Sequence, residues 1–263
     1  MKLSTVFDPF FHTISIQKCD GPSPSFVGFG VLLRIEGKDY IASAAHVVND
    51  LPDDVGIAIV KGYEIKGSMD RPSRIFAKKQ QDGTYKSGID LALLLVTTKY
   101  RKFFAEEGMS FFDLDKNNPP PVTGECFISG FPAKKNNYDS GRKKYPETPG
   151  CHHIQSFMEC PDRVLAIGGD PEFHFALETR KKGDFFDGFT NKRIPELFDL
   201  HGMSGGGVWH MFKGQGEKIP KCATGIAGIF IEDRDTKRDR QGMAKVVKIE
   251  AIRNVIEFIK SAI

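Results

Sequence analysis

The decapeptide HGMSGGGVWH, residues 201 to 210, places one serine among four glycines and ends on a β-branched residue, an aromatic residue and a histidine. A serine hydroxyl becomes an effective nucleophile when a neighbouring base accepts its proton. Glycine allows backbone conformations that other residues resist. Ser204 is therefore a candidate nucleophile, provided that the rest of the chain supplies a base and a group that orients it. The alternative is a flexible turn.

Two other uses of clustered glycines fit this segment poorly. Residues 202–206 satisfy the G-x-S-x-G pattern of the α/β-hydrolase nucleophile elbow, in which the catalytic histidine follows the serine. The only histidine after Ser204 is His210, in a strand-like run, and the chain lacks the alternating helices of that fold. A phosphate-binding loop needs a Lys-Ser or Lys-Thr pair at the start of a helix. Gly207, Val208 and Trp209 follow instead.

A base for Ser204 must come from upstream, and two segments qualify. In GKDYIASAAHVVND (37–50) a run of small residues leads to His46 and lets a neighbouring group approach its ring. In GIDLALLLV (88–96) Asp90 precedes an apolar strand, where a carboxylate is costly to desolvate without a partner. Each residue alone has an ordinary structural explanation. Together they are upstream candidates for activating Ser204 as a nucleophile.

The segments IASAAHVV, DLALL and HGMSGG resemble the histidine, aspartate and serine motifs of trypsin-like serine proteases, in the same chain order. The separations are 90 − 46 = 44 and 204 − 90 = 114 residues. The resemblance implies two six-stranded antiparallel β-barrels with the active site in the cleft between them. It also implies a triad of His46, Asp90 and Ser204, and an oxyanion hole formed by the backbone N–H groups of Gly202 and Ser204.

The implied activity is that of a serine endopeptidase, which hydrolyses peptide bonds through an acyl-enzyme and needs no cofactor. Met203 departs from the family, because digestive and clotting proteases carry an aspartate there that pairs with a newly cut N-terminus. No Ile-Val-Gly-Gly sequence lies near the start of the chain. Activation by N-terminal insertion is therefore not expected, and the chain is more similar to stand-alone bacterial members of the family.

The resemblance also assigns residues to substrate binding. Phe198, six residues before the nucleophile, falls at the base of the specificity pocket and favours a small or apolar P1 side chain over Lys or Arg. A one-residue shift of the loop would place Asp199 there instead. The opposite wall is expected from residues of the GIAGIFIE strand, which are Gly228, Ile229 and Phe230. His201 either lines the cleft or is an exposed loop residue.

Short strand-like runs separated by Gly, Pro and Asp turns dominate the chain, which indicates an all-β fold rather than repeated strand-helix units. These runs are residues 11–16, 26–35, 40–45, 55–60, 90–96, 124–130, 152–157, 164–169, 172–177, 207–212 and 223–231. Three consecutive prolines predict a linker at 115–121, between an N-terminal barrel at 1–114 and a C-terminal barrel at 122–247. Isoleucines spaced by three and four residues predict a C-terminal helix at 248–263.

Composition limits the remaining function classes. The net charge of +3 is too small to favour a nucleic-acid or membrane partner, and no 18-residue apolar span occurs. The five cysteines are odd in number and scattered, which favours a reducing compartment and predicts a cytoplasmic protein. Cys151, His152, His153 and Cys160 are zinc-ligand types, but their spacing matches no standard finger. No metal is expected.

We therefore expect a polypeptide substrate. A protease in the cytoplasm endangers its host, so we also expect control by a regulatory protein partner or by a distorted oxyanion loop. The strongest alternative is a catalytically silent or latent version of the same fold that acts as a protein-binding module. The presence of all three triad residue types favours the enzyme.

Overall fold

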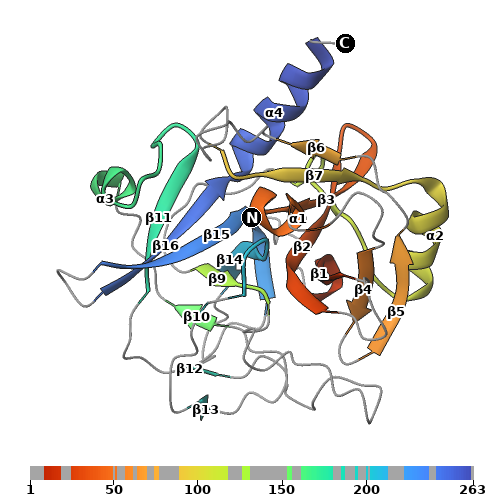
Figure 1. Cartoon of the computed structure of the whole chain (residues 1–263), viewed down its shortest axis with the longest axis horizontal. Coiled ribbons are helices and arrows are strands. Elements are labelled where there is room, and N and C mark those ends of the chain that lie inside the picture. The colour runs from red at the N-terminus through yellow and green to blue at the C-terminus, as the bar shows by residue number, and fades with distance from the viewer. Residues whose placement is uncertain are drawn as a thin grey trace, which may run out of the picture.

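The computed structural model of the protein contains two large β-sheets (Figure 1). The structure describes residues 9–18, 25–49, 51, 57–61, 64–69, 74–76, 89–117, 126–130, 153–155, 161–179, 185–186, 193–194, 200, 202–212, 222–236 and 241–261. All strand pairings are antiparallel within these ranges, apart from one short parallel pair. The strand-rich architecture agrees with the sequence prediction.

The first sheet contains eight strands in the order β5-β4-β1-β2-β3-β7-β6, with β8 pairing in parallel to β2. They are β1 (Thr13–Lys18), β2 (Ser25–Ile35), β3 (Lys38–Ser43), β4 (Ile57–Lys61), β5 (Glu64–Met69), β6 (Arg74–Phe76), β7 (Ala92–Leu95) and β8 (Phe112–Asp113). Three helical segments belong to this half: the 3-10 turn η1 (Pro9–His12), α1 (Ala45–Asn49) and α2 (Thr98–Glu106).

The second sheet contains six strands in the order β10-β9-β14-β15-β16-β11. They are β9 (Cys126–Ile128), β10 (His153–Gln155), β11 (His174–Thr179), β14 (Gly207–Phe212), β15 (Cys222–Thr236) and β16 (Gln241–Lys248). A separate two-stranded ribbon pairs β12 (Phe185–Phe186) with β13 (Arg193–Ile194). The helices of this half are α3 (Pro161–Ala166) and α4 (Ile249–Ser261).

The sheets differ in detail from two six-stranded barrels. The first sheet has eight strands rather than six, because β5, β6 and β8 add to the strands that the sequence pattern marks. Across the described residues, no pairing joins β5 to β6 or β10 to β11, so neither sheet closes through its outermost strands. The predicted linker lies mostly outside the described ranges, and the boundaries at 115 and 122 stay predictions.

The strand predicted at residues 164–169 is wrong, because Pro161–Ala166 form the helix α3. Proline suits the first turn of a helix, where its missing N–H is not needed. The buried residues Val164 and Ile167 are three apart, as on one helix face. Gly168 has a φ of 70° and, with Gly169, donates backbone hydrogen bonds to the last turn. The glycines end a short helix rather than a strand.

The predicted C-terminal helix is confirmed as α4. Its isoleucines Ile249, Ile252 and Ile256 are buried, and they belong to the same apolar cluster as the core of the first sheet. Arg253 donates from Nη2 to the carbonyl of Leu114 at 2.5 Å, so α4 also bonds to the segment that follows β8. None of the helices in the described ranges is long and apolar enough to span a bilayer.

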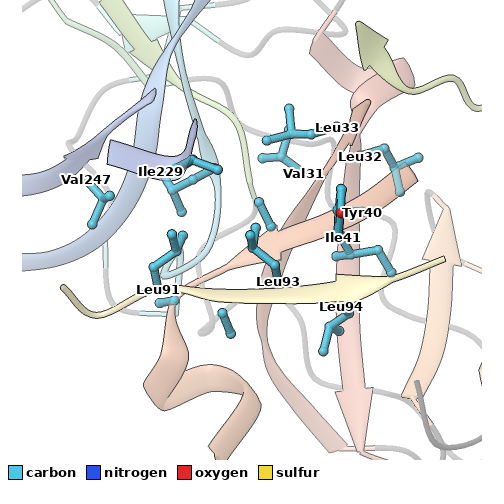
Figure 2. Close-up of a cluster of buried hydrophobic side chains, with 14 of the residues drawn as sticks. Val31, Leu32, Leu33, Tyr40, Ile41, Leu91, Leu93, Leu94, Ile229 and Val247 are labelled. Carbon is cyan, nitrogen blue, oxygen red and sulfur yellow. The ribbon is translucent and has the colours of Figure 1, made fainter. Parts of the chain in front are cut away.

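One apolar cluster runs from the first sheet into the second (Figure 2). Leu91 and Leu93, from the β7 segment, share this cluster with Ile229 of β15 and Val247 of β16. A second cluster, which includes Phe175, fills the interior of the second half. Because the first cluster crosses the boundary, the chain next to Asp90 is packed between the two halves.

A buried polar junction also joins the halves. Trp209 of β14 donates from Nε1 to the hydroxyl of Ser129 at 2.9 Å. The same hydroxyl lies 2.7 Å from the Thr13 hydroxyl at the start of β1. The ring of His12 stacks on Trp209 with centroids 5.7 Å apart. The Ser129 hydroxyl thus links the first strand of one half to the strand that follows the serine loop in the other.

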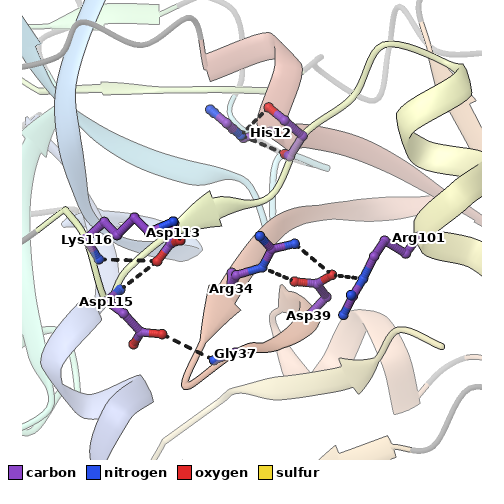
Figure 3. A network of polar contacts seen from close by, with 9 residues as sticks. His12, Arg34, Gly37, Asp39, Arg101, Asp113, Asp115 and Lys116 are labelled. Carbon is purple, nitrogen blue, oxygen red and sulfur yellow. Dashed lines mark hydrogen bonds and ion pairs between the residues drawn. The ribbon is translucent and has the colours of Figure 1, made fainter. Parts of the chain in front are cut away.

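A buried carboxylate near the start of β3 pairs with two arginines, one from β2 and one from α2 (Figure 3). The side chain of Asp39 is fully buried and pairs with Arg34 at 2.7 Å and with Arg101 at 2.5 Å. The hydrogen bond to Asp39 raises the pKa of Arg34 above its usual value, against the opposing effect of burial. The N–H of Val96 donates to the Asp39 carbonyl at 2.9 Å. The opposite ends of β3 and β7 lead to His46 and Asp90.

We expect Asp39→Asn to lower the free energy of unfolding by about 1.5–3 kcal/mol, because it removes a buried charge that two guanidinium groups bond. Urea denaturation monitored by circular dichroism measures the change. Asp115→Asn is the control, since Asp115 makes an exposed 3.3 Å contact with the Gly37 N–H. Its effect should stay within about 0.5 kcal/mol. Equal effects of the two variants would contradict a bracing role for Asp39.

Candidate active site

Strand pairing brings His46 and Asp90 together. β3 ends at Ser43, which pairs with Ala92 at the start of β7, so the residues just beyond these ends lie side by side. His46 Nδ1 lies 2.6 Å from Asp90 Oδ2. The backbone N–H of His46 donates to Asp90 Oδ1 at 3.0 Å. The two carboxylate oxygens thus hold the imidazole and its own backbone, which fixes the orientation of the ring.

The electrostatic environment keeps Asp90 ionised. Burial alone would raise the pKa of Asp90, but the hydrogen bonds from the His46 ring and from the backbone of His46 and Ala45, with the charge of His46, lower it overall. The Asp90 side chain is 15% exposed, whereas that of His46 is 41% exposed. An ionised carboxylate at Nδ1 favours the tautomer that carries its proton on Nδ1. Nε2 is then a proton acceptor on an accessible ring.

The loop around Ser204 adopts a conformation that depends on glycine. Gly202 has a φ of 86° and Gly205 a φ of 85°, in the left-handed region that side chains resist. Met203 between them is fully buried, and Ser204 is half-buried. The loop therefore leaves Ser204 partly accessible, while the preceding residue enters the core.

Three backbone N–H groups of this loop donate hydrogen bonds within the second half. The N–H groups of Met203, Gly205 and Gly206 donate at 2.8–3.0 Å, to the carbonyls of Leu200, Phe230 and Met203 respectively. Within the described residues, no hydrogen bond uses the N–H of Gly202 or of Ser204. These are the two groups that the sequence assigns to an oxyanion hole. Two preorganised N–H donors beside a nucleophile can stabilise a developing negative charge.

β2 holds the serine loop against the histidine segment. The N–H of Phe29 donates to the Ser204 carbonyl at 2.8 Å. A Cβ at Gly28 would lie 2.8 Å from that carbonyl and 2.7 Å from a methyl of Val47, the residue after His46. Gly28 is therefore in contact with both segments at once. In Figure 1, α1 lies near the middle of the molecule, where the two halves adjoin.

Gly205 brings the loop into direct contact with the strand that leads to His46. A Cβ at Gly205 would lie 2.0 Å from the carbonyl of Phe29 and 2.4 Å from the hydroxyl of Ser43. Ser43 is buried, and its hydroxyl donates to the same Phe29 carbonyl at 2.6 Å. Gly205 therefore allows close packing of one half on the other. The small residues before His46 predict such an approach, whereas no sequence signal marks Gly28.

The predicted substrate-binding residues are placed only in part. Phe198 and His201, as well as Asp199, lie outside the described residues. Gly228, Ile229 and Phe230 lie in β15, between β14 and β16. Phe230 accepts the Gly205 N–H through its carbonyl and donates its own N–H to Gly206, both at 2.8 Å. Its backbone thus holds the serine loop, and the expected contact of these residues with a substrate stays a prediction.

Groups of metal-ligand residues do not occur in the described ranges, where no three His, Cys, Asp or Glu side chains gather. Of the four residues with zinc-ligand chemistry, Cys151, His152 and Cys160 lie outside these ranges, and His153 lies in β10. His210 is buried in β14, with Nδ1 3.9 Å from the Cys126 sulfur. Burial lowers the pKa of His210 and keeps its ring neutral.

Comparison with known proteins supports the fold and goes no further. No model of a known protein family and no curated protein matches the chain. A solved structure of kallikrein-related peptidase 10 in complex with Zn²⁺ is similar, with a TM-score of 0.51 and 14% identity over 96% of this chain and 95% of that chain. A second solved structure comes from work on aromatic interactions in the coupled folding and binding of the Sesbania mosaic virus VPg protein. Its TM-score is 0.46, with 13% identity over 92% of this chain and 87% of that chain.

We expect Gly28→Ala to lower the free energy of unfolding by about 1–3 kcal/mol, because its Cβ would displace Val47 or the Ser204 carbonyl. Guanidinium denaturation measures the change. Gly37→Asn is the control, since nothing lies within 4 Å of a Cβ there and its φ of 70° is one that Asn tolerates. Its effect should stay within about 0.5 kcal/mol. A neutral Gly28→Ala would show that Gly28 does not set the spacing.

We expect the Asp90–His46 pair to stabilise the fold in a pH-dependent way. The folded pKa of Asp90 lies below its ordinary value of 3.8, so its contribution is present above that value. It is lost as the pH falls through the folded pKa, because the unfolded chain binds the proton first. The difference in unfolding free energy between wild type and Asp90→Asn should therefore shrink from pH 6 to below pH 3.8. A constant difference would contradict the lowered pKa.

Proposed function

We propose that the protein is a serine endopeptidase that hydrolyses peptide bonds through an acyl-enzyme on Ser204. The observation that carries the proposal is the contact at Gly28, which adjoins the Ser204 carbonyl on one side and the segment of His46 on the other. Two further features support it: the 2.6 Å pair of His46 and Asp90, and the unused N–H groups of Gly202 and Ser204 in the described residues. The kallikrein-related peptidase shares the fold alone.

In this mechanism the Ser204 hydroxyl attacks the carbonyl carbon of the scissile peptide while His46 Nε2 takes its proton. The N–H groups of Gly202 and Ser204 bond the oxyanion of the tetrahedral intermediate. His46 then gives the proton to the leaving amine, and the acyl-enzyme forms. Asp90 keeps its negative charge throughout, holds the tautomer of His46 and stabilises the imidazolium. A water molecule, activated by the same imidazole, hydrolyses the acyl-enzyme.

The remaining parts of the proposal concern substrate, partner and location. The substrate is a polypeptide with a small or apolar P1 side chain, a preference that depends on Phe198. No cofactor takes part in the proposed steps. We place the protein in the cytoplasm, where thiols such as the buried Cys126 stay reduced. A regulatory protein partner is part of this proposal, because a cytoplasmic endopeptidase needs control.

We expect an alkyl fluorophosphonate probe to label folded wild-type protein on Ser204, as shown by peptide mapping with mass spectrometry. Ser204→Ala and His46→Ala should abolish labelling. Asp90→Asn should slow labelling by about 10³–10⁴-fold. The amide oxygen can still accept the backbone N–H of His46, but the NH₂ group then faces Nδ1 and moves the ring proton to Nε2, which can no longer accept the serine proton. Heat-unfolded wild type is the control for labelling that needs no folded site.

The alternative, a catalytically silent or latent protein-binding module with this fold, makes the opposite prediction. Folded wild type would then resist the probe even at long exposure, although its unfolding transition is intact. Labelling that maps to a serine other than Ser204, or that survives His46→Ala unchanged, would also overturn the proposed mechanism.

A further inference from the structure

Met203 is the only residue of the segment GMSGGG, 202–207, with an apolar side chain, and that side chain is fully buried. It lies in the core cluster of the second half, together with Ile128, Val208 and Phe230. The flanking Gly202 and Ser204 are half-buried. A single apolar side chain thus attaches the loop to the interior of the second half.

The tip of Met203 extends toward the boundary with the first half. A Cβ at Gly130 would lie 3.3 Å from the Met203 methyl carbon and 3.3 Å from the ring of Phe29. Gly130 therefore adjoins both side chains, and Phe29 is the residue whose N–H bonds the Ser204 carbonyl. The space around the Met203 methyl group is bounded by elements that hold the nucleophile in place.

The backbone of Met203 sets the direction of a proposed oxyanion donor. The Met203 carbonyl and the Ser204 N–H belong to one trans peptide group, so they point in opposite directions in one plane. The carbonyl accepts the Gly206 N–H at 3.0 Å, and the Met203 N–H donates to Leu200 at 2.9 Å. With the side chain fixed as well, the Ser204 N–H is directed away from the Gly206 side of the loop.

We propose that Met203 is a positioning residue that keeps the oxyanion loop in its working arrangement by apolar packing in the uncut chain. The proposal rests on the proposed function of Ser204. A neutral side chain among apolar neighbours needs no ionic partner, so neither a newly formed N-terminus nor any other charge is required to order the loop. Among the described residues, the side chains that pack with Met203 are apolar, and a carboxylate in their midst would be costly to bury.

The test uses saturation kinetics of the fluorophosphonate probe on the full chain, which separate the maximal labelling rate kinact from the half-saturating concentration KI. We expect Met203→Ala to lower kinact by about 10–100-fold with KI nearly unchanged, since a displaced donor weakens stabilisation of the oxyanion-like transition state. Met203→Leu, which conserves apolar volume, should restore kinact to within about threefold of wild type. The labelled wild type should have the mass of the full chain plus probe.

Met243→Ala is the matched control. Met243 is also a fully buried methionine of the second half, but it packs with Val164, Ile167 and Ala176 away from the loop. It should lower the thermal midpoint about as much as Met203→Ala and leave kinact at the wild-type value. Met203→Val serves if Met203→Ala does not fold, because its shorter side chain keeps the core apolar but cannot reach Gly130.

The outcomes separate this proposal from the proposed function. If wild type is labelled and the Met203 variant that folds keeps the wild-type kinact, Met203 does not position the loop and the proposed function stands. If Met243→Ala lowers kinact equally, loss of stability rather than positioning explains the effect, and the proposal fails. The proposal for Met203 also fails if the probe labels only a proteolytically shortened chain and not the full chain. A folded wild type that resists the probe overturns both proposals.

Discussion

The hydrogen bond from the Phe29 N–H to the Ser204 carbonyl is the contact on which the candidate site depends. Phe29 belongs to the first sheet and Ser204 to a loop of the second half, so this bond fixes Ser204 relative to the half that carries His46 and Asp90. Gly28 makes the approach possible, because no side chain stands between the loop and Val47. A shift of one half against the other would break these contacts together.

Other interactions across the boundary make such a shift costly. The Leu91 side chain, next to Asp90, is buried with Ile229 and Val247 of the second half. The Ser129 hydroxyl accepts from Trp209 and contacts Thr13, so a polar link runs beside the apolar one. Apolar packing contributes most of the free energy that holds the two halves together, whereas hydrogen bonds with defined partners fix the position of one half relative to the other. The geometry of the site follows from both.

The sequence was sufficient for the parts that depend on local pattern. Isoleucines at helical spacing predicted α4, alternating and apolar runs predicted most strands, and small residues before His46 predicted a close approach of another segment. The sequence prediction failed where one pattern is compatible with two structures. In α3, an apolar run followed by glycines is compatible both with a capped helix and with a strand. The extra strand β5 carries too little apolar content to stand out, and β6 has only three residues, so both depend on pairing with neighbours elsewhere in the chain.

The candidate site also contains residues that the sequence predicts and residues that it does not. His46, Asp90 and Ser204 were predicted because their three motifs resemble those of one family in the same chain order, but Gly28 and Phe29 were not, because their contacts form only when the two halves meet. Asp39 and Met203 are both buried, but a charged side chain suits one position and an apolar side chain suits the other because their neighbours differ. The buried Asp39 is stable because two arginines bond it from the same half. Met203 enters a cluster of apolar side chains, where only a neutral group can anchor the loop without an added partner.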